Sequence, residues 1–81
     1  IHLAGHSLAD GHSSLLIDDH GSAVAQPVWD ILTKTLHAIG PRPILIEWDT
    51  RIPELSVLMA EMGHAQKILD QIDTAMAPHA A

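Results

Sequence analysis

Titratable side chains follow three apolar runs of this sequence, and their spacing suits the binding of a metal ion. In "LLIDDHG" (15–21), Asp18 and His20 stand two positions apart. On an extended backbone these two side chains point to the same side, while Asp19 between them points to the other. One carboxylate and one imidazole can then bind a shared cation, and a mixed histidine and carboxylate set suits iron, manganese or zinc.

The other two apolar runs carry the same kinds of residue. "IHLAG" (1–5) contains His2, and "PILIEW" (43–48) contains Glu47. In parallel α/β folds, functional residues gather where strands end and loops begin. A carboxylate in a partly dry site is costly unless a cation compensates it. We therefore predict a metal site with these ligands: His2, Asp18, His20 and Glu47.

Each of these residues also has a structural interpretation. Asp18 and His20 would then cap backbone groups of a turn, and Glu47 would pair with an arginine. His6 is expected beside the metal ligands, where it would orient one of them or contact substrate, and an exposed loop histidine is the alternative. Asp49 also follows the third apolar run, but it is interpreted as a helix-entry or structural residue because Thr50 and Pro53 are near it.

The segments that carry these residues are expected to be strands of one parallel sheet. The three apolar runs lie at 1–5, 15–18 and 43–48, and the last two have the continuous apolar character of strands that are buried on both faces. After the second and the third run, apolar residues recur at helical intervals, so predicted strands and helices alternate. That alternation predicts a parallel sheet with right-handed crossovers, in the α/β class.

Two helices are predicted from proline positions and apolar periodicity. Pro27 suits a first helical turn and Gly40 a stop, while Pro53 begins a longer helix in which Gly63 predicts a break or kink. The first helix is expected to bury one apolar stripe: Val28, Ile31, Leu32, Thr35, Leu36 and Ile39.

The chain is too small to complete such a fold. Its 81 residues begin with Ile1, directly in a strand-like run. A three-stranded parallel sheet with helices on one side leaves an apolar face and an edge uncovered. We therefore expect residues 1–81 to be one partial domain, the C-terminal portion of a larger α/β protein whose N-terminal part is absent.

Composition excludes several classes of function. Lys and Arg total 4 against 10 Asp and Glu, for a formal charge of −6, which disfavours nucleic-acid binding. The absence of cysteine excludes disulfides and thiolate chemistry within these residues. No apolar run reaches the roughly 18 residues of a membrane span, and no signal peptide is visible. A cytoplasmic protein that does not act at a membrane is expected.

Four ordered motifs resemble a known family. "IHLAGH", "LLIDDHG", "QPVWDIL" and "ILIEWD" follow one another as in the C-terminal third of the DUF692 (UPF0276) family of multinuclear non-haem iron-dependent oxidative enzymes. The resemblance extends to about Ala65. It implies a TIM barrel of the xylose-isomerase-like type, in which the apolar runs would be strands six, seven and eight.

The resemblance also implies roles for individual residues. His2 would be an iron ligand as the histidine that begins the H-L-A-G-H motif. Asp18 and His20 would match the D-x-H-G ligand pair, whose middle position is commonly threonine and here is Asp19. Glu47 would be the ligand of the E-W-D motif. The remaining ligands of the two or three irons would lie on earlier strands, so these residues alone are expected to be inactive.

By the same resemblance, the intact protein would oxidise cysteine residues of ribosomally made precursor peptides with dioxygen. A small partner protein that recruits the peptide is implied as well. Two alternatives stay open: another divalent-metal barrel, such as a sugar isomerase or an endonuclease with zinc or manganese, and a truncated domain without catalysis. The identity of the bound metal would distinguish the first alternative from the iron-dependent enzyme. A stable monomer that binds no metal would indicate the second alternative.

Overall fold

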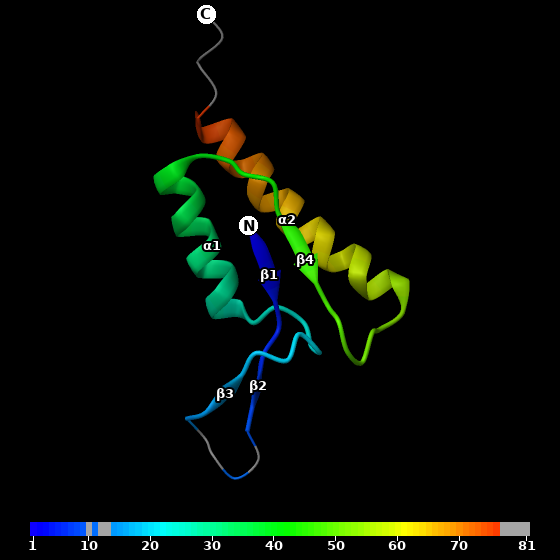
Figure 1. The fold of residues 1–81 in the computed structure, drawn as a ribbon. Coiled ribbons are helices and arrows are strands. Elements are labelled where there is room, and N and C mark those ends of the chain that lie inside the picture. The colour runs from blue at the N-terminus through cyan, green and yellow to red at the C-terminus, as the bar shows by residue number, and fades with distance from the viewer. Residues whose placement is uncertain (10, 12–13, 77–81) are drawn as a thin grey trace, which may run out of the picture.

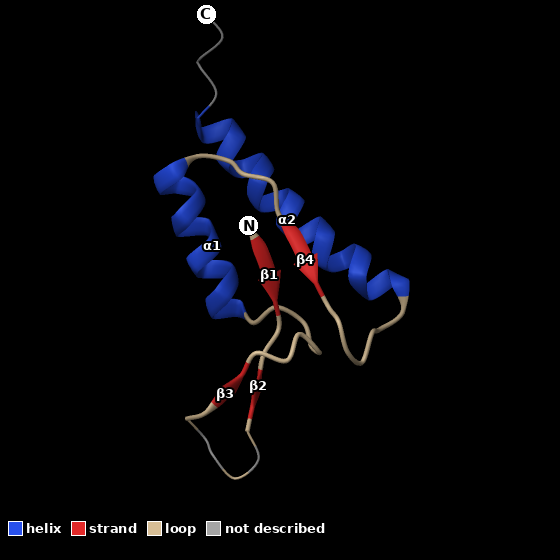
Figure 2. Ribbon diagram, in the orientation of Figure 1, coloured by secondary structure: helices blue, strands red, loops and turns tan. Residues whose placement is uncertain are grey.

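The structure is a computed structural model that describes residues 1–9, 11 and 14–76. Its elements follow in this order: β1 (His2–Ala4), β2 (Ser7–Leu8), β3 (Leu16–Ile17), α1 (Gln26–Ile39), β4 (Leu45–Glu47) and α2 (Leu55–Met76). β1 and β4 lie side by side next to the two helices, and the β2–β3 hairpin projects from the end of this layer (Figures 1 and 2).

The parallel pair of β1 and β4 separates two faces. His2 pairs with Leu45, Leu3 with Ile46, and Ala4 with Glu47. Leu3 is buried in the core and Ile46 packs against it, so this register position faces the helices. Since side chains alternate along a strand, His2 and Glu47 lie on the opposite face, which the helices leave uncovered.

Helix α1 begins and ends where the sequence predicts, but the residues that it buries differ from the predicted stripe. Pro27 lies in the first turn, and Gly40 ends the helix with a φ of 86° and a hydrogen bond from its N–H to the carbonyl of Leu36. Trp29, rather than Ile31, joins the core because the helix turns that side toward α2. Two expected stripe residues, Ile31 and Ile39, are 63% and 48% exposed.

Helix α2 runs unbroken through Gly63, so the predicted break is wrong. A Cβ at Gly63 would meet nothing within 4 Å, which shows open space beside that turn. The helix packs against α1, and its buried residues complete the core cluster: Leu3, Val24, Trp29, Leu32, Leu36, Ala65, Ile68 and Ile72.

The expectation that residues 15–18 form a buried parallel strand is wrong. β3 pairs antiparallel with β2, in the register Ser7 to Ile17 and Leu8 to Leu16. β1 pairs directly with β4, so no third strand lies between them. The β3 side chains are exposed, with Leu16 at 56% and Ile17 at 43%. In the described residues the parallel sheet therefore has two strands, and the segment before Asp18 is a hairpin that returns the chain to the end of β1.

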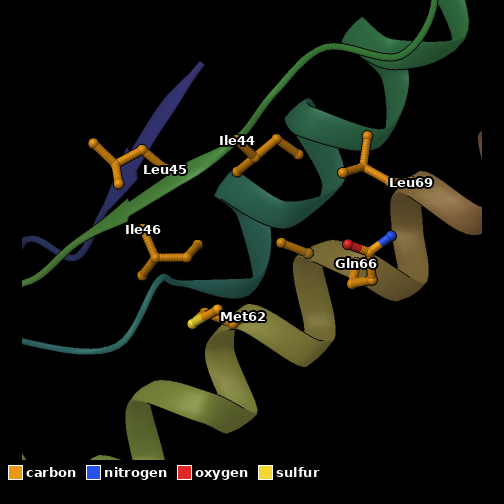
Figure 3. A pocket seen from close by; sticks show the side chains of 7 residues that line it. Ile44, Leu45, Ile46, Met62, Gln66 and Leu69 are labelled. Carbon is orange, nitrogen blue, oxygen red and sulfur yellow. The ribbon is translucent and has the colours of Figure 1, made fainter.

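A small apolar pocket lies between β4 and α2. It measures about 200 Å³ and is lined by Ile44, Leu45, Ile46, Met62, Ala65, Gln66 and Leu69 (Figure 3). The pocket is on the helix side of β4, away from the titratable residues at the strand end. Among the described residues, no helix has the length and apolarity to cross a bilayer.

Candidate metal centre

His20 lies at the centre of a cluster of carboxylates. Its Nε2 lies 2.7 Å from Oδ1 of Asp18. On the other side of the ring, Nδ1 lies 3.0 Å from Oδ2 of Asp49 and 3.4 Å from Oε2 of Glu47. The imidazole therefore has an acidic partner at each nitrogen, and segments far apart in the sequence supply these partners.

Glu47 connects this group to β1. Its Oε1 contacts Nδ1 of His2, and its Oε2 faces His20. The contact with His2 follows from the register of the parallel pair, which places both residues on the uncovered face. The structure thus brings together all four residues that the sequence singles out as ligands: His2, Asp18, His20 and Glu47.

Asp49 is the residue that the sequence-based interpretation missed. Helix α2 begins at Leu55, so Asp49 does not start a helix. Instead its backbone N–H donates to the carbonyl of His20 at 2.7 Å, and its carboxylate faces the ring of His20. The signal was present in the spacing, because Glu47 and Asp49 are two positions apart, as Asp18 and His20 are.

Three of these side chains lie close enough to one another to approach a single cation. His20, Glu47 and Asp49 each offer one ligand atom, and these atoms all lie within 4.8 Å of one another. Bonds of about 2.1 Å to a divalent transition metal separate the ligands of one ion by roughly 3 to 4 Å, so small side-chain movements suffice. An imidazole with two carboxylates also suits iron, manganese or zinc chemically. The donor set therefore fits a divalent metal.

Hydrogen bonding raises the pKa of His20 above its ordinary value of 6.5. The largest cause is the hydrogen bond with Asp49, the negative charge and hydrogen bond of Asp18 add to it, and burial opposes both. A protonated ring is the metal-free substitute for a cation among these carboxylates. Metal binding must displace that proton, because only a neutral imidazole nitrogen is a ligand.

Asp19 points to other partners, as alternation along an extended segment predicts. Its carboxylate accepts a hydrogen bond from Ser7 at 2.6 Å and pairs with Arg51 at 3.0 Å. The bond from Ser7 is the main reason that the pKa of Asp19 lies below its ordinary value, and the backbone N–H of Gly21 and the charge of Arg51 act in the same direction.

His6 is half-buried at the end of β1, beside the loop that follows His20. The contact that the structure shows for it uses the backbone, since its carbonyl accepts a hydrogen bond from Ser22 Oγ at 3.2 Å. The role predicted for its side chain stays a prediction.

Comparison with known proteins places the chain in a family. The family model described as RiPP precursor modification enzyme MbnB/TglH/ChrH, where RiPP denotes a ribosomally made and modified peptide, matches residues 1–70. The chain therefore belongs to this family, the one to which its four motifs point.

Relatives from several bacteria agree with this assignment. A "UPF0276 protein" of Caulobacter vibrioides is 49% identical over 78 residues, which cover 96% of this chain and 28% of that protein. One of Chromobacterium violaceum is 48% identical over 73 residues, covering 90% of this chain and 25% of the relative. One of Paraburkholderia phytofirmans is 43% identical over 79 residues, covering 95% and 26%. The chain spans about a quarter of the length of these curated relatives, and no solved structure matches it.

Proposed function

We propose that residues 1–81 are the C-terminal portion of a TIM-barrel enzyme that oxidises cysteine residues of ribosomally made precursor peptides, with iron and dioxygen. The observation that carries the proposal is the set of contacts that joins His2, Asp18, His20 and Asp49 around Glu47, the last residue of β4, in a chain of this family.

The arrangement of layers supports a partial barrel. A TIM barrel has helices outside its parallel strands, and its functional residues lie at the carboxyl ends of the strands. Here both helices pack on one face of β1 and β4, while His2 and Glu47 occupy the other face. Glu47 is the last residue of β4, and Asp49 follows it in the loop. The remaining strands would then cover the second face.

The residues of the cluster have separable roles in holding a metal. Carboxylates of Asp18, Glu47 and Asp49 would compensate its charge, while His2 and His20 would provide nitrogen ligands. The two nitrogens of His20 have different acidic partners, so an ion at one nitrogen leaves the other to donate its N–H to the opposite carboxylate. Such a bond fixes the tautomer and the orientation of a metal-binding imidazole.

When bound, iron supplies the redox chemistry with dioxygen that oxidation of a thiol requires. The residues of this chain would bind and orient the metal through the cluster around His20. A small protein that recruits the peptide belongs to the same proposal.

Metal content tests the proposal. The full chain, as its gene encodes it, is produced anaerobically and compared with an Asp18→Ala/His20→Ala variant by elemental analysis. His37→Ala is a matched control, because His37 is an exposed histidine on α1, outside the cluster. We expect two or more irons per chain, the same number in the control, and at least one fewer in the double variant.

The outcomes separate the alternatives. Zinc or manganese in place of iron would indicate the isomerase or endonuclease branch of metal-dependent barrels. A folded chain without metal would indicate a domain that does not catalyse the reaction. Unchanged iron in a folded double variant would exclude Asp18 and His20 from the site.

A further inference from the structure

Asp19 stands between two proposed metal ligands in the sequence, yet its carboxylate binds other segments. Oδ2 accepts a hydrogen bond from Ser7 Oγ at 2.6 Å and pairs with Nη2 of Arg51 at 3.0 Å. Oδ1 accepts the N–H of Gly21 at 3.4 Å. Hydrogen bonds to a charged group are stronger than neutral ones. One carboxylate therefore joins β2, the loop after β3 and the loop after β4.

The backbone around Asp19 makes the same connection. Its carbonyl accepts the hydroxyl of Thr50 at 3.3 Å. The carbonyl of His20 accepts the N–H groups of Asp49 and Thr50, at 2.7 and 3.3 Å. The loop that carries His20 and the loop that carries Asp49 are thus bonded directly to each other.

Both loops have uncommon backbone conformations at this junction. His20 has a φ of 50° and Arg51 a φ of 49°, in the left-handed region that side chains with a Cβ rarely adopt. Such conformations persist only where the surrounding contacts impose them. The two loops also approach closely, since a Cβ at Gly21 would lie 2.5 Å from Oγ1 of Thr50 and 2.9 Å from Nη2 of Arg51.

These observations give Asp19 a specific task. The backbone conformation of His20 decides where its ring points, and a strained conformation needs support on both sides. Asp19 precedes His20 and is anchored to Ser7 and Arg51, whereas Gly21 follows it and packs against Thr50. The Asp19 side chain is 22% exposed, so its charge is partly shielded from water.

We propose that Asp19 is a positioning residue, which with Ser7 and Arg51 forms a clamp that holds His20 and Asp49 at metal-binding distance. This proposal rests on the proposed metal site and adds to it a residue that is not itself a ligand. Loss of the clamp loosens His20 relative to Asp49, so metal binding weakens although every ligand is still present. The expected loss of affinity is about 10- to 100-fold, as for other residues that orient metal ligands.

Anaerobic titration of the full chain with cobalt(II) tests the clamp. Visible absorption bands of cobalt report the geometry of its ligands as well as its affinity. We expect Asp19→Ala and Arg51→Gln to bind cobalt more weakly, with shifted bands. Asp19→Asn keeps an acceptor for Ser7 and is expected to recover part of the loss. Asp73→Asn, an exposed aspartate on α2, is the matched control and is expected to bind as the unchanged chain does.

The results distinguish failure of the clamp from failure of the metal site. A chain that binds neither cobalt nor iron would overturn both proposals. Cobalt binding that His20→Ala abolishes, with affinity and spectrum unchanged in folded Asp19→Ala, would overturn the clamp alone. A lower Tm with an unchanged affinity would likewise overturn it, because Asp19 would then serve only the fold. If Asp19→Ala fails to fold, Arg51→Gln decides, since the Arg51 side chain is 68% exposed and its loss is tolerated more easily.

Discussion

Two apolar segments of nearly the same composition have opposite environments in this protein. Ile44 precedes β4, and Leu45 and Ile46 belong to it; this strand pairs in parallel with β1 and packs against the core through Ile44 and Ile46, while Leu45 is 52% exposed. Leu15, Leu16 and Ile17 lead into the ligand pair, yet they belong to an antiparallel hairpin and are 43% to 56% exposed.

The difference shows what an apolar run does and does not determine. Both runs are strongly β-forming, and both are strands. Burial depends on the partner, because β4 packs against the core on one face, whereas β3 pairs with the short strand β2 and contributes no residue to the core cluster of the described residues. The layer of β1, β4 and the helices therefore contains the buried core and supplies His2 and Glu47, whereas the loop after the hairpin supplies Asp18 and His20. Substitutions in the two parts, and at the residues where they meet, test this difference.

Truncation of a core side chain should give the largest effect. Leu36 is 0% exposed between the helices and the sheet, whereas Leu16 is 56% exposed on the hairpin. Leu36→Ala is expected to lower the free energy of unfolding by about 2 to 5 kcal/mol, because it removes buried surface and leaves a cavity. Leu16→Ala should stay within about 0.5 kcal/mol. Urea unfolding of the full chain measures both, and equal losses would mean that the hairpin is covered in the native protein.

Substitution of Glu47 should weaken metal binding without unfolding the layer of β1, β4 and the helices. Glu47 faces both His2 and His20, so Glu47→Gln removes the group that joins the two histidines. Removal of a ligand should weaken metal binding by more than the roughly 10- to 100-fold that outer residues cost. Glu54→Gln is the control, since Glu54 is exposed just before α2. Calorimetric titration with iron(II) gives both affinities, and equal values would exclude Glu47 as a ligand.

Glycine-to-alanine substitutions should change the free energy of unfolding in opposite directions in the two regions. Gly63 lies on a helix with free space beside it, so Gly63→Ala is expected to raise the free energy of unfolding by about 0.5 to 1 kcal/mol. Gly21→Ala should lower it, because the new Cβ would lie 2.5 Å from Oγ1 of Thr50. Thermal unfolding of both variants provides the comparison. A neutral Gly21→Ala would show that the two loops can separate without cost.

The smallest expected effect is a pH dependence of the metal-free chain. The pKa of His20 is raised above 6.5, chiefly by Asp49, so the protonated ring stabilises the folded chain below pH 6.5. That stabilisation is lost as the pH rises through the raised pKa. NMR titration of the imidazole signals should give a lower His20 pKa in Asp49→Asn. An unchanged pKa would mean that the ring and Asp49 do not interact in solution.

Much of the site was predictable because its signals are local. Acids and histidines two positions apart indicate side chains on one side of an extended segment, and this pattern identified Asp18 and His20, whereas Glu47 was predicted from its place at the end of an apolar run. Asp49 has the same spacing from Glu47, but Pro53 nearby favoured the interpretation as a helix start. The structure shows loop residues 50–54 between Asp49 and α2, and Asp49 lies against His20.

By itself, the sequence determined which segments are helical, which residues are chemically equipped to bind a metal, and to which family the chain belongs. These properties follow from local spacing, from side-chain chemistry and from the order of motifs. Only the tertiary structure decided that β1 pairs with β4, that "LLI" forms an exposed hairpin, and that Asp49 joins His20. Strand pairing and loop closure bring together residues up to 45 positions apart, as His2 and Glu47 show, and their energies depend on which surfaces meet, a property that no single segment contains.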